Sequence, residues 1–189
     1  TYSQKINNIG FANAILVNAG NANACNGDHG DKDVITMSIL AGNVMSVAPE
    51  NILVAQTGII GHKLPMDIVE MGISKLSEAL SCGETADKSF SKAIMTTDLV
   101  PKQISAEVYS EFWEGPIKIG GSCKGSGMIA PNMATMLCFL TTDASISHDT
   151  LQSALLYATE KTFNRMTVDG DTSTNDMILC LANGASTVS

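Results

Sequence analysis

Threonine and glycine residues gather at the ends of apolar stretches of this sequence, where they could take part in chemistry. Thr57-Gly58 ends one apolar stretch, Thr96-Thr97-Asp98 follows an expected helix, and the segment from Lys124 to Thr135 precedes another apolar stretch. Each segment alone is typical of a turn, because glycine adopts positive φ and Thr and Asp side chains bond to nearby backbone. Together they also fit an enzyme that uses a threonine hydroxyl as its nucleophile.

A threonine hydroxyl acts as a nucleophile only when a base lies beside it. Every chain can supply an α-amine as that base, because the amine forms when the peptide bond before the threonine is cut. Its ordinary pKa of roughly 7.7–8.0 lets the amine accept a proton near neutral pH. The residues alone do not decide which threonine would act in this way.

Two familiar nucleotide and hydrolase motifs are absent from the glycine-rich segment. The sequence around Lys124 does not match the phosphate loop Gly-x-x-x-x-Gly-Lys-Ser/Thr. Neither Ser122 nor Ser126 lies in a Gly-x-Ser-x-Gly nucleophile elbow. The segment therefore indicates neither phosphate binding nor a serine hydrolase.

The sequence also predicts no metal site. Asp169 to Asp176 resembles the start of a calcium loop, but Thr174 and Cys180 stand where the loop needs Gly and Glu. The histidines are isolated, with no second ligand at metal-binding spacing; they are His29, His62 and His148.

The composition indicates a folded, acidic protein. Its 189 residues include 11 Lys and Arg against 19 Asp and Glu, a formal net charge of −8, so we expect no nucleic-acid partner and no binding to anionic membranes. Hydrophobic residues make up 44%, which favours a buried core. The apolar runs Ile52–Ala55 and Met177–Ala182 are far shorter than a membrane span. Five cysteines without a Cys-x-x-Cys pair indicate reduced thiols.

Helices and strands are expected to alternate along the whole chain. Apolar, β-branched runs predict buried strands at Phe11–Val17, Ile52–Ala55, Met136–Leu140 and Met177–Ala182. Residues Ile104–Tyr109 and Pro116–Ile119 are expected to pair as a hairpin, with residues 120–127 as a glycine-rich loop. Apolar spacing predicts helices at Asp31–Val47, from Pro65 to Leu80, at Ala86–Met95 and at Asp149–Asn164. This alternation predicts a single α/β unit over residues 1–189.

The segment Lys124-Gly125-Ser126-Gly127-Met128-Ile129-Ala130-Pro131-Asn132-Met133-Ala134-Thr135-Met136-Leu137 resembles the motif of the ornithine acetyltransferase (ArgJ) family. Four further segments are similar to the family in the same order, and the resemblance covers essentially the whole chain. They are Asn18–Cys25, Thr57–Gly61, Ile94–Asp98 and Val168–Asp176. The resemblance implies an α/β fold, a layered sandwich of the ArgJ and self-cleaving aminopeptidase type.

The resemblance also implies a reaction. Family members are made as one precursor that cuts itself at an Ala-Thr bond, here Ala134–Thr135. Thr135 would become the nucleophile, its freed amine the base, and an acetyl group would pass from N-acetylornithine to glutamate through an acetyl-threonine ester. Such a ping-pong reaction needs no cofactor. Whether acetyl-CoA also serves as an acetyl donor stays open.

The other site residues are likewise assigned by the resemblance. Thr57, through its hydroxyl, and Gly58, through its backbone N–H, match the family's donors to the tetrahedral oxyanion. Thr97 and Lys124 match its substrate-binding threonine and lysine, and an ammonium group suits a substrate carboxylate. For Asp169 to Asp176 the resemblance gives no catalytic role, and we expect a loop that bonds to itself and shapes the site.

Two departures and the chain's length qualify the resemblance. Gln56 stands where the family usually has Ser before Thr-Gly, and Cys138 where it usually has Gly after Met-Leu. Family enzymes are about twice as long as this chain. We therefore expect the central portion of a longer precursor, with residues 1–134 in its α chain and 135–189 in its β chain.

Two other functions stay open at this stage. A related N-terminal-nucleophile amidohydrolase or aminopeptidase would pass the acyl group to water, and an inactive piece would act only as a binding module. For the leading reading, the resemblance implies an α₂β₂ assembly of the two cleaved chains. It also implies the cytoplasm of a bacterium or the mitochondrial matrix of a fungus.

Overall fold

The computed structural model describes residues 1–129, 136–171 and 175–186. The chain divides into two compact units, Thr1–Ala86 and Asp87–Ser189, and each contains both helices and strands. The single α/β unit that the sequence predicts over residues 1–189 stays a prediction.

The first unit is built on two parallel strands. β1 (Ala14–Asn21) pairs with β2 (Ile52–Ile59), so that Ala14 lies opposite Ile52 and Gly20 opposite Gly58. The connection between the strands contains α2 (Gly27–Met45) and the short 3-10 helix η1 (Pro49–Asn51). Helix α1 (Tyr2–Asn7) precedes the sheet and α3 (Met66–Ala79) follows it.

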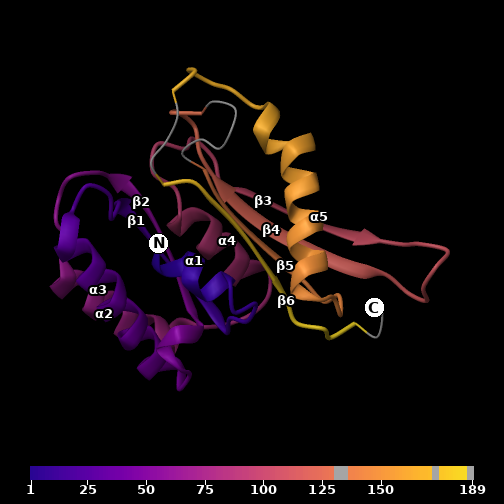
Figure 1. Ribbon diagram of the computed structural model, residues 1–189, viewed down its shortest axis with the longest axis horizontal. Coiled ribbons are helices and arrows are strands. Elements are labelled where there is room, and N and C mark those ends of the chain that lie inside the picture. The colour runs from indigo at the N-terminus through magenta and orange to yellow at the C-terminus, as the bar shows by residue number, and fades with distance from the viewer. Residues whose placement is uncertain (130–135, 172–174, 187–189) are drawn as a thin grey trace. The chain divides into compact units, whose positions relative to one another are not determined.

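The core of the first unit lies between β2 and two helices. Figure 1 shows α2 and α3 side by side on one side of the strands. Alternate residues of β2 point toward these helices, and the buried cluster consists of Met37, Ala41, Ile52, Val54, Leu64 and Ile73. Helix α1 is attached to β2 by Ser3, whose hydroxyl donates to the Val54 carbonyl at 2.8 Å and accepts from the Val54 N–H at 3.0 Å.

The second unit contains a four-stranded sheet in the order β3-β4-β5-β6. The strands are β3 (Lys102–Val108), β4 (Ile117–Lys124), β5 (Leu137–Thr142) and β6 (Met177–Ala182). The β3–β4 and β4–β5 pairs are antiparallel, and the β5–β6 pair is parallel. The parallel pair is joined through α5 (His148–Lys161) and the 3-10 helix η2 (Phe163–Arg165).

Helices pack against this sheet. In Figure 1, α5 crosses the face of the sheet that is turned toward the viewer. Helix α4 (Glu84–Ala93) places Phe90 edge-on against Phe139 of β5, with ring centroids 5.6 Å apart. Such edge-to-face pairs contribute about 0.5–1.5 kcal/mol beyond the area they bury.

The structure corrects one predicted loop. The glycine-rich residues 120–124 form the second half of β4 and pair with both neighbouring strands. A Cβ on Gly121 would lie 2.6 Å from Leu140 Cδ2, so a larger residue there would force the end of the Leu140 side chain to shift. Low strand propensity is overridden here by pairing on both sides.

Most other elements lie where they were expected, with shifted ends. The hairpin between β3 and β4 is confirmed, and β2 extends four residues beyond the predicted Ala55 to Ile59. Helix α2 begins at Gly27 instead of Asp31, and α1 was not predicted. The start of α2 has no side-chain capping hydrogen bond from Asn26, and helix ends are the least certain part of such a prediction.

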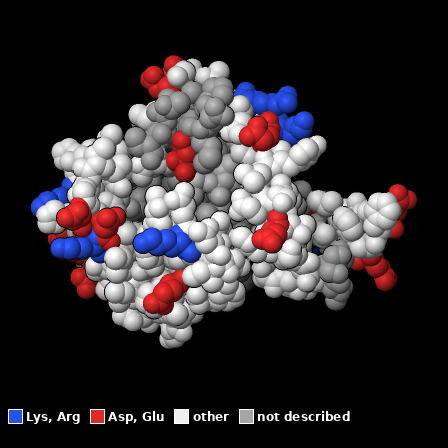
Figure 2. All heavy atoms as spheres, in the orientation of Figure 1, with Lys and Arg blue, Asp and Glu red and all other residues white. Residues whose placement is uncertain are grey.

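The described surface has no broad basic region on the face shown in Figure 2, where acidic and basic side chains are interspersed among uncharged ones. In the described residues, no helix has both the length and the apolar character needed to cross a membrane. All five cysteines are free thiols.

Candidate active site

Thr57 and Gly58 lie near the carboxyl end of β2, in the first unit. The Thr57 residue is 1% exposed, and Gly58 has φ +130°. A Cβ on Gly58 would lie 2.2 Å from the carbonyl carbon of Gly20, which faces it on β1. Only glycine fits this position, because both its φ and the closeness of the two strands exclude a side chain.

The Asn18–Cys25 motif packs along the same strand end. The Ala22 N–H donates to the Ile59 carbonyl at 2.9 Å, and the Gly61 N–H donates to the Ala24 carbonyl at 2.9 Å. The Asn21 amide donates to the His62 carbonyl at 3.2 Å. The Asn18–Cys25 and Thr57–Gly61 motifs are thus joined by hydrogen bonds at the carboxyl end of β2.

Asn18 belongs to the first of these two motifs, and sequence reasoning assigned no role to its side chain. Its Nδ2 donates to the Asn21 carbonyl at 2.8 Å, while its Oδ1 is buried without a donor among the described residues. Asn18 of β1 lies opposite Gln56 of β2, one position before the pair formed by Ala19 and Thr57. Its place inside a motif was the only signal that could have pointed to it.

Asp98 joins two motif segments in the second unit. One carboxylate oxygen, Oδ1, accepts from Lys102 Nζ at 2.5 Å and from the Gly125 N–H at 2.7 Å, and Oδ2 accepts from the Thr96 N–H at 3.3 Å. Burial by itself would raise the pKa of Asp98, but these three hydrogen bonds outweigh it and hold the pKa below its usual value. Asp98 therefore stays ionised and fixes the Thr96–Thr97 turn against the segment after β4.

Thr97 and Lys124 lie on the two segments that Asp98 joins. Thr97 Oγ1 and Ser126 Oγ are 2.8 Å apart and share a hydrogen bond. Lys124 is the last residue of β4 and is only 3% exposed. Lys124 is therefore not a solvated lysine of a surface loop.

Two carboxylates partly oppose the effect of burial on the pKa of Lys124. Burial lowers the pKa of Lys124 most strongly, and the cation of Lys102 lowers it further. The negative charges of Asp98 and Asp176 act in the opposite direction without cancelling the shift. A substrate carboxylate beside this ammonium group would stabilise its charged form.

The Val168–Asp176 motif lies beside the segment that follows Lys124. The Val168 N–H donates to the Ile129 carbonyl at 2.8 Å, and the Met136 N–H donates to Asp176 Oδ1 at 3.0 Å. The predicted cleavage bond Ala134–Thr135 itself lies outside the described residues. Its described neighbours in sequence are thus attached to this motif.

The structure thus brings together some of the predicted site residues. Thr97 bonds to Ser126, and Asp98 bonds to Gly125, the residue after Lys124, so Thr97 and Lys124 lie on two hydrogen-bonded segments of the second unit. Sequence reasoning did not assign Asp98 or Ser126 to the site. Thr57 and Gly58 belong to the first unit. The Asp98 carboxylate could have been suspected from its place in the Thr-Thr-Asp segment, but its partners could not.

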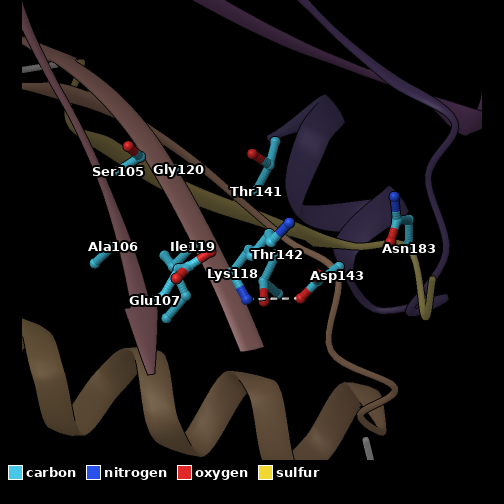
Figure 3. A pocket seen from close by; sticks show the side chains of 10 residues that line it. All are labelled: Ser105, Ala106, Glu107, Lys118, Ile119, Gly120, Thr141, Thr142, Asp143 and Asn183. Atoms are coloured by element: carbon cyan, nitrogen blue, oxygen red, sulfur yellow. Dashed lines mark hydrogen bonds between the residues drawn. The ribbon is translucent and has the colours of Figure 1, made fainter. Parts of the chain in front are cut away.

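A separate pocket of about 570 Å³ lies at the other end of the second unit's sheet. In Figure 3 its residues come from β3, β4, β5 and the ends of the strands, and the backbone N–H of Lys118 donates to Asp143 Oδ1 at 2.8 Å. Lys118 is about 20 Å along β4 from Lys124. The pocket is therefore distinct from the Lys124 cluster. In the described part of the chain, no group of three His, Cys, Asp or Glu side chains is arranged to hold a metal ion.

Comparison with known proteins gives consistent matches. The model of the ArgJ family matches residues 1–189. The arginine biosynthesis bifunctional protein ArgJ of Symbiobacterium thermophilum is 51% identical over 175 residues, which are 93% of this chain and 42% of that protein. The protein of the same name from Bacillus thuringiensis is 51% identical over 92% of this chain and 41% of its own length. The chain spans about two fifths of the length of these relatives.

Two solved structures support the same conclusion. The crystal structure of ArgJ from Bacillus halodurans has a TM-score of 0.59 and 32% identity, and it covers 71% of each chain. Ornithine acetyltransferase from Mycobacterium tuberculosis, solved in complex with ornithine, has a TM-score of 0.65 and 31% identity, over 69% of this chain and 68% of that one. These neighbours confirm the predicted α/β fold. With its full length matched by the family model and half of its residues identical to curated members, this chain belongs to the ArgJ family.

Proposed function

We propose that this chain carries part of the active site of an N-acetyltransferase that moves acetyl from N²-acetylornithine to glutamate. The observation that carries the proposal is the buried ammonium group of Lys124, held within a cluster formed by two of the family's motif segments. Its relatives are named as arginine biosynthesis bifunctional proteins, and a structural neighbour was solved with ornithine. The reaction would place the protein in arginine biosynthesis.

Self-cleavage would prepare the nucleophile. The Thr135 hydroxyl oxygen attacks the Ala134 carbonyl carbon, the C–N bond breaks, and the departing nitrogen takes the proton. Water then hydrolyses the resulting ester, which leaves a carboxylate on Ala134 and a free amine and hydroxyl on Thr135. This route supplies the base that a threonine nucleophile needs.

Acetyl transfer would then occur in two half-reactions. The Thr135 amine removes the hydroxyl proton as the oxygen attacks the acetyl carbonyl, and ornithine leaves with that proton. The amine of glutamate attacks the acetyl-threonine ester in the second half, which restores the hydroxyl. In both halves the Thr57 hydroxyl and the Gly58 N–H are proposed to donate to the oxyanion. Loss of one such donor costs roughly 10²–10³ in rate.

Lys124 and Thr97 are proposed to bind the substrate. Both substrates carry a carboxylate, and a buried ammonium group attracts it more strongly than an exposed one because water screens the charge less. We further propose that the reaction needs no cofactor and that the cleaved chains assemble as α₂β₂. Acetyl-CoA stays an alternative donor.

Product analysis of the complete product of the gene that encodes this chain tests the proposal. With acetyl-labelled N²-acetylornithine and glutamate, we expect labelled N-acetylglutamate and free ornithine. Without glutamate, ornithine release should stop near one equivalent per active site. Continuous release of labelled acetate in both reactions would instead identify a hydrolase, and no release at all would indicate a binding module.

A further inference from the structure

Three of the five cysteines lie on neighbouring strands of the second unit's sheet. Cys123 is on β4, Cys138 on β5 and Cys180 on β6. Cys123 lies directly opposite Cys138, and Cys180 lies opposite Leu140. Residues opposite each other share one face of a sheet, as do every second residue along a strand, so all three thiols point to the same face. The proposed function gives none of them a role.

The register shows how close Cys123 and Cys138 are. The Asp143 N–H donates to the Lys118 carbonyl at 3.3 Å, so these two residues form a pair of the hydrogen-bonded kind. Hydrogen-bonded and non-hydrogen-bonded pairs alternate along an antiparallel ladder, and Cys123 lies five positions further along β4. Cys123 and Cys138 therefore form a non-hydrogen-bonded pair, with Cα atoms about 4.5 Å apart. This separation lies within the range of about 4.4–6.8 Å that a disulfide needs.

Cys180 is too far from either thiol to form the same bond. It lies two residues along β6 from Ile178, the residue opposite Cys138. A strand spacing of about 4.8 Å and a rise of about 3.3 Å per residue place the Cα atoms of Cys180 and Cys138 about 8 Å apart. Cys123 lies two strands away from Cys180. Because a disulfide beyond about 7 Å requires the backbone to move, Cys180 is an internal control.

The two thiols of the pair differ in burial and in charge. Cys138 is 2% exposed, and burial, together with the neighbouring thiols, raises its pKa to about 12. Cys123 is only half-buried. Burial raises the pKa of Cys123 as well, the cation of Lys102 opposite it on β3 lowers it, and the anion of Asp98 raises it. Cys123 is therefore the thiol that an oxidant reaches first, and Cys138 is the thiol that completes the bond.

We propose that Cys123 and Cys138 are a site of disulfide formation, which oxidised glutathione or another small disulfide closes. The Cys123 thiol loses its proton and attacks one sulfur of oxidised glutathione, which breaks the S–S bond and releases one glutathione thiolate to take up a proton. Cys138 then loses its proton and attacks the Cys123 sulfur, which releases the second glutathione. Two protein thiols are oxidised, and one glutathione disulfide is reduced to two thiols.

The bond would have two consequences at the candidate site. Cys123 directly precedes Lys124, and Lys124 lies opposite Leu137, the residue before Cys138. The bond would thus fix β4 to β5 next to the buried ammonium group. The two cysteines also lie on opposite sides of Ala134–Thr135 in sequence, so the two chains expected from self-cleavage would stay covalently linked. Only this second consequence rests on the proposed function; the pairing of the thiols does not.

The experiment treats the complete gene product, reduced and then freed of reductant, with oxidised glutathione under native conditions. Remaining thiols are alkylated, and the links are mapped by mass spectrometry after tryptic digestion without reductant. Trypsin cuts after Lys124, which places Cys123 and Cys138 in different peptides. We expect these two peptides to be joined in the parent. Cys180→Ala, the matched control, should keep the link, and Cys138→Ala should lose it completely and carry glutathione on Cys123.

Each outcome decides for or against the pair. Alkylation of both cysteines in the parent, glutathione on Cys123 beside an alkylated Cys138, or a link to Cys180 would overturn the inference. The parent's map decides even where a variant does not fold, which circular dichroism checks.

The intact mass reads the proposed function separately. Two chains that become one mass on oxidation, and separate again with reductant, support both proposals. An uncut chain with the Cys123–Cys138 link supports the pair and contradicts self-cleavage. Two chains that stay separate after oxidation support self-cleavage and contradict the pair.

Discussion

The two regions that carry predicted site residues are built in different ways. At the end of β2, the Thr57–Gly58 region is shaped by backbone: Gly58 and Gly20 face each other where no side chain fits, and motif residues bond through main-chain groups. At the end of β4, the Lys124 cluster is shaped by charged side chains, with Asp98 and Lys102 bonded beside a buried lysine. The first region should respond to added volume and the second to removed charge.

The largest effect is expected from adding one methyl group to the backbone-built region. In Gly58→Ala the new Cβ would overlap Gly20, and the residue would be held at φ +130°. We expect a loss of about 3 kcal/mol in the free energy of unfolding, from steric overlap and backbone strain together. Urea-induced unfolding measures it.

Gly61→Ala is the matched control. Gly61 also has positive φ, at +75°, but a Cβ there would meet nothing within 4 Å. Its cost should be the strain alone, about 1 kcal/mol. Equal costs at Gly58 and Gly61 would show that closeness to β1 is not what requires glycine.

Removing the buried ammonium group should come next in size. Lys124→Met keeps much of the volume and loses the charge, so we expect KM for N²-acetylornithine to rise roughly 10- to 100-fold, the effect of a charge-assisted hydrogen bond. Lys118→Met, on the exposed part of β4, is the control and should leave KM unchanged.

The pH dependence sharpens this prediction. Because the pKa of Lys124 is lowered, substrate affinity should fall with rising pH earlier than an ordinary lysine would allow. Lys124→Met should lose this dependence. A KM that follows the same pH curve in parent and variant would contradict a role for the Lys124 charge in binding.

Removal of the Asp98 carboxylate is expected to have a smaller effect on stability. Asp98→Ala leaves the Gly125 and Thr96 N–H groups without their acceptor, which should lower the free energy of unfolding by about 1–3 kcal/mol. The pKa of Asp98 is lower in the folded state, so its contribution is complete above about pH 4 and is lost as the pH falls further. Urea unfolding at pH 7 and pH 3.5 would check that sign; a parent–variant difference that grows toward low pH would contradict it.

The sequence predicted the fold where a pattern is local. The apolar runs at Ile52 and Met177 and the hairpin at Ile104 follow from side-chain periodicity alone, and the structure has strands there. The second half of β4 could not be predicted, because residues 120–124 become a strand only through their two neighbours.

The candidate site shows the same difference between local and long-range signals. Lys124 and Thr97 were found by resemblance, yet nothing local indicates that Asp98 would join their segments or that Asp169 would reach Met128 across 41 residues. Long-range hydrogen bonds of carboxylates leave no periodic signal in a sequence. The residues that hold a site are therefore harder to predict than the residues that occupy it.

The most direct test of the central claim is an intact-mass spectrum of the complete gene product beside its Thr135→Ala variant. The proposal predicts two polypeptides in the parent, meeting at Ala134–Thr135, and a single uncut polypeptide in the variant. A single uncut mass in the parent, or cleavage at the same bond in the variant, would contradict Thr135 as the nucleophile.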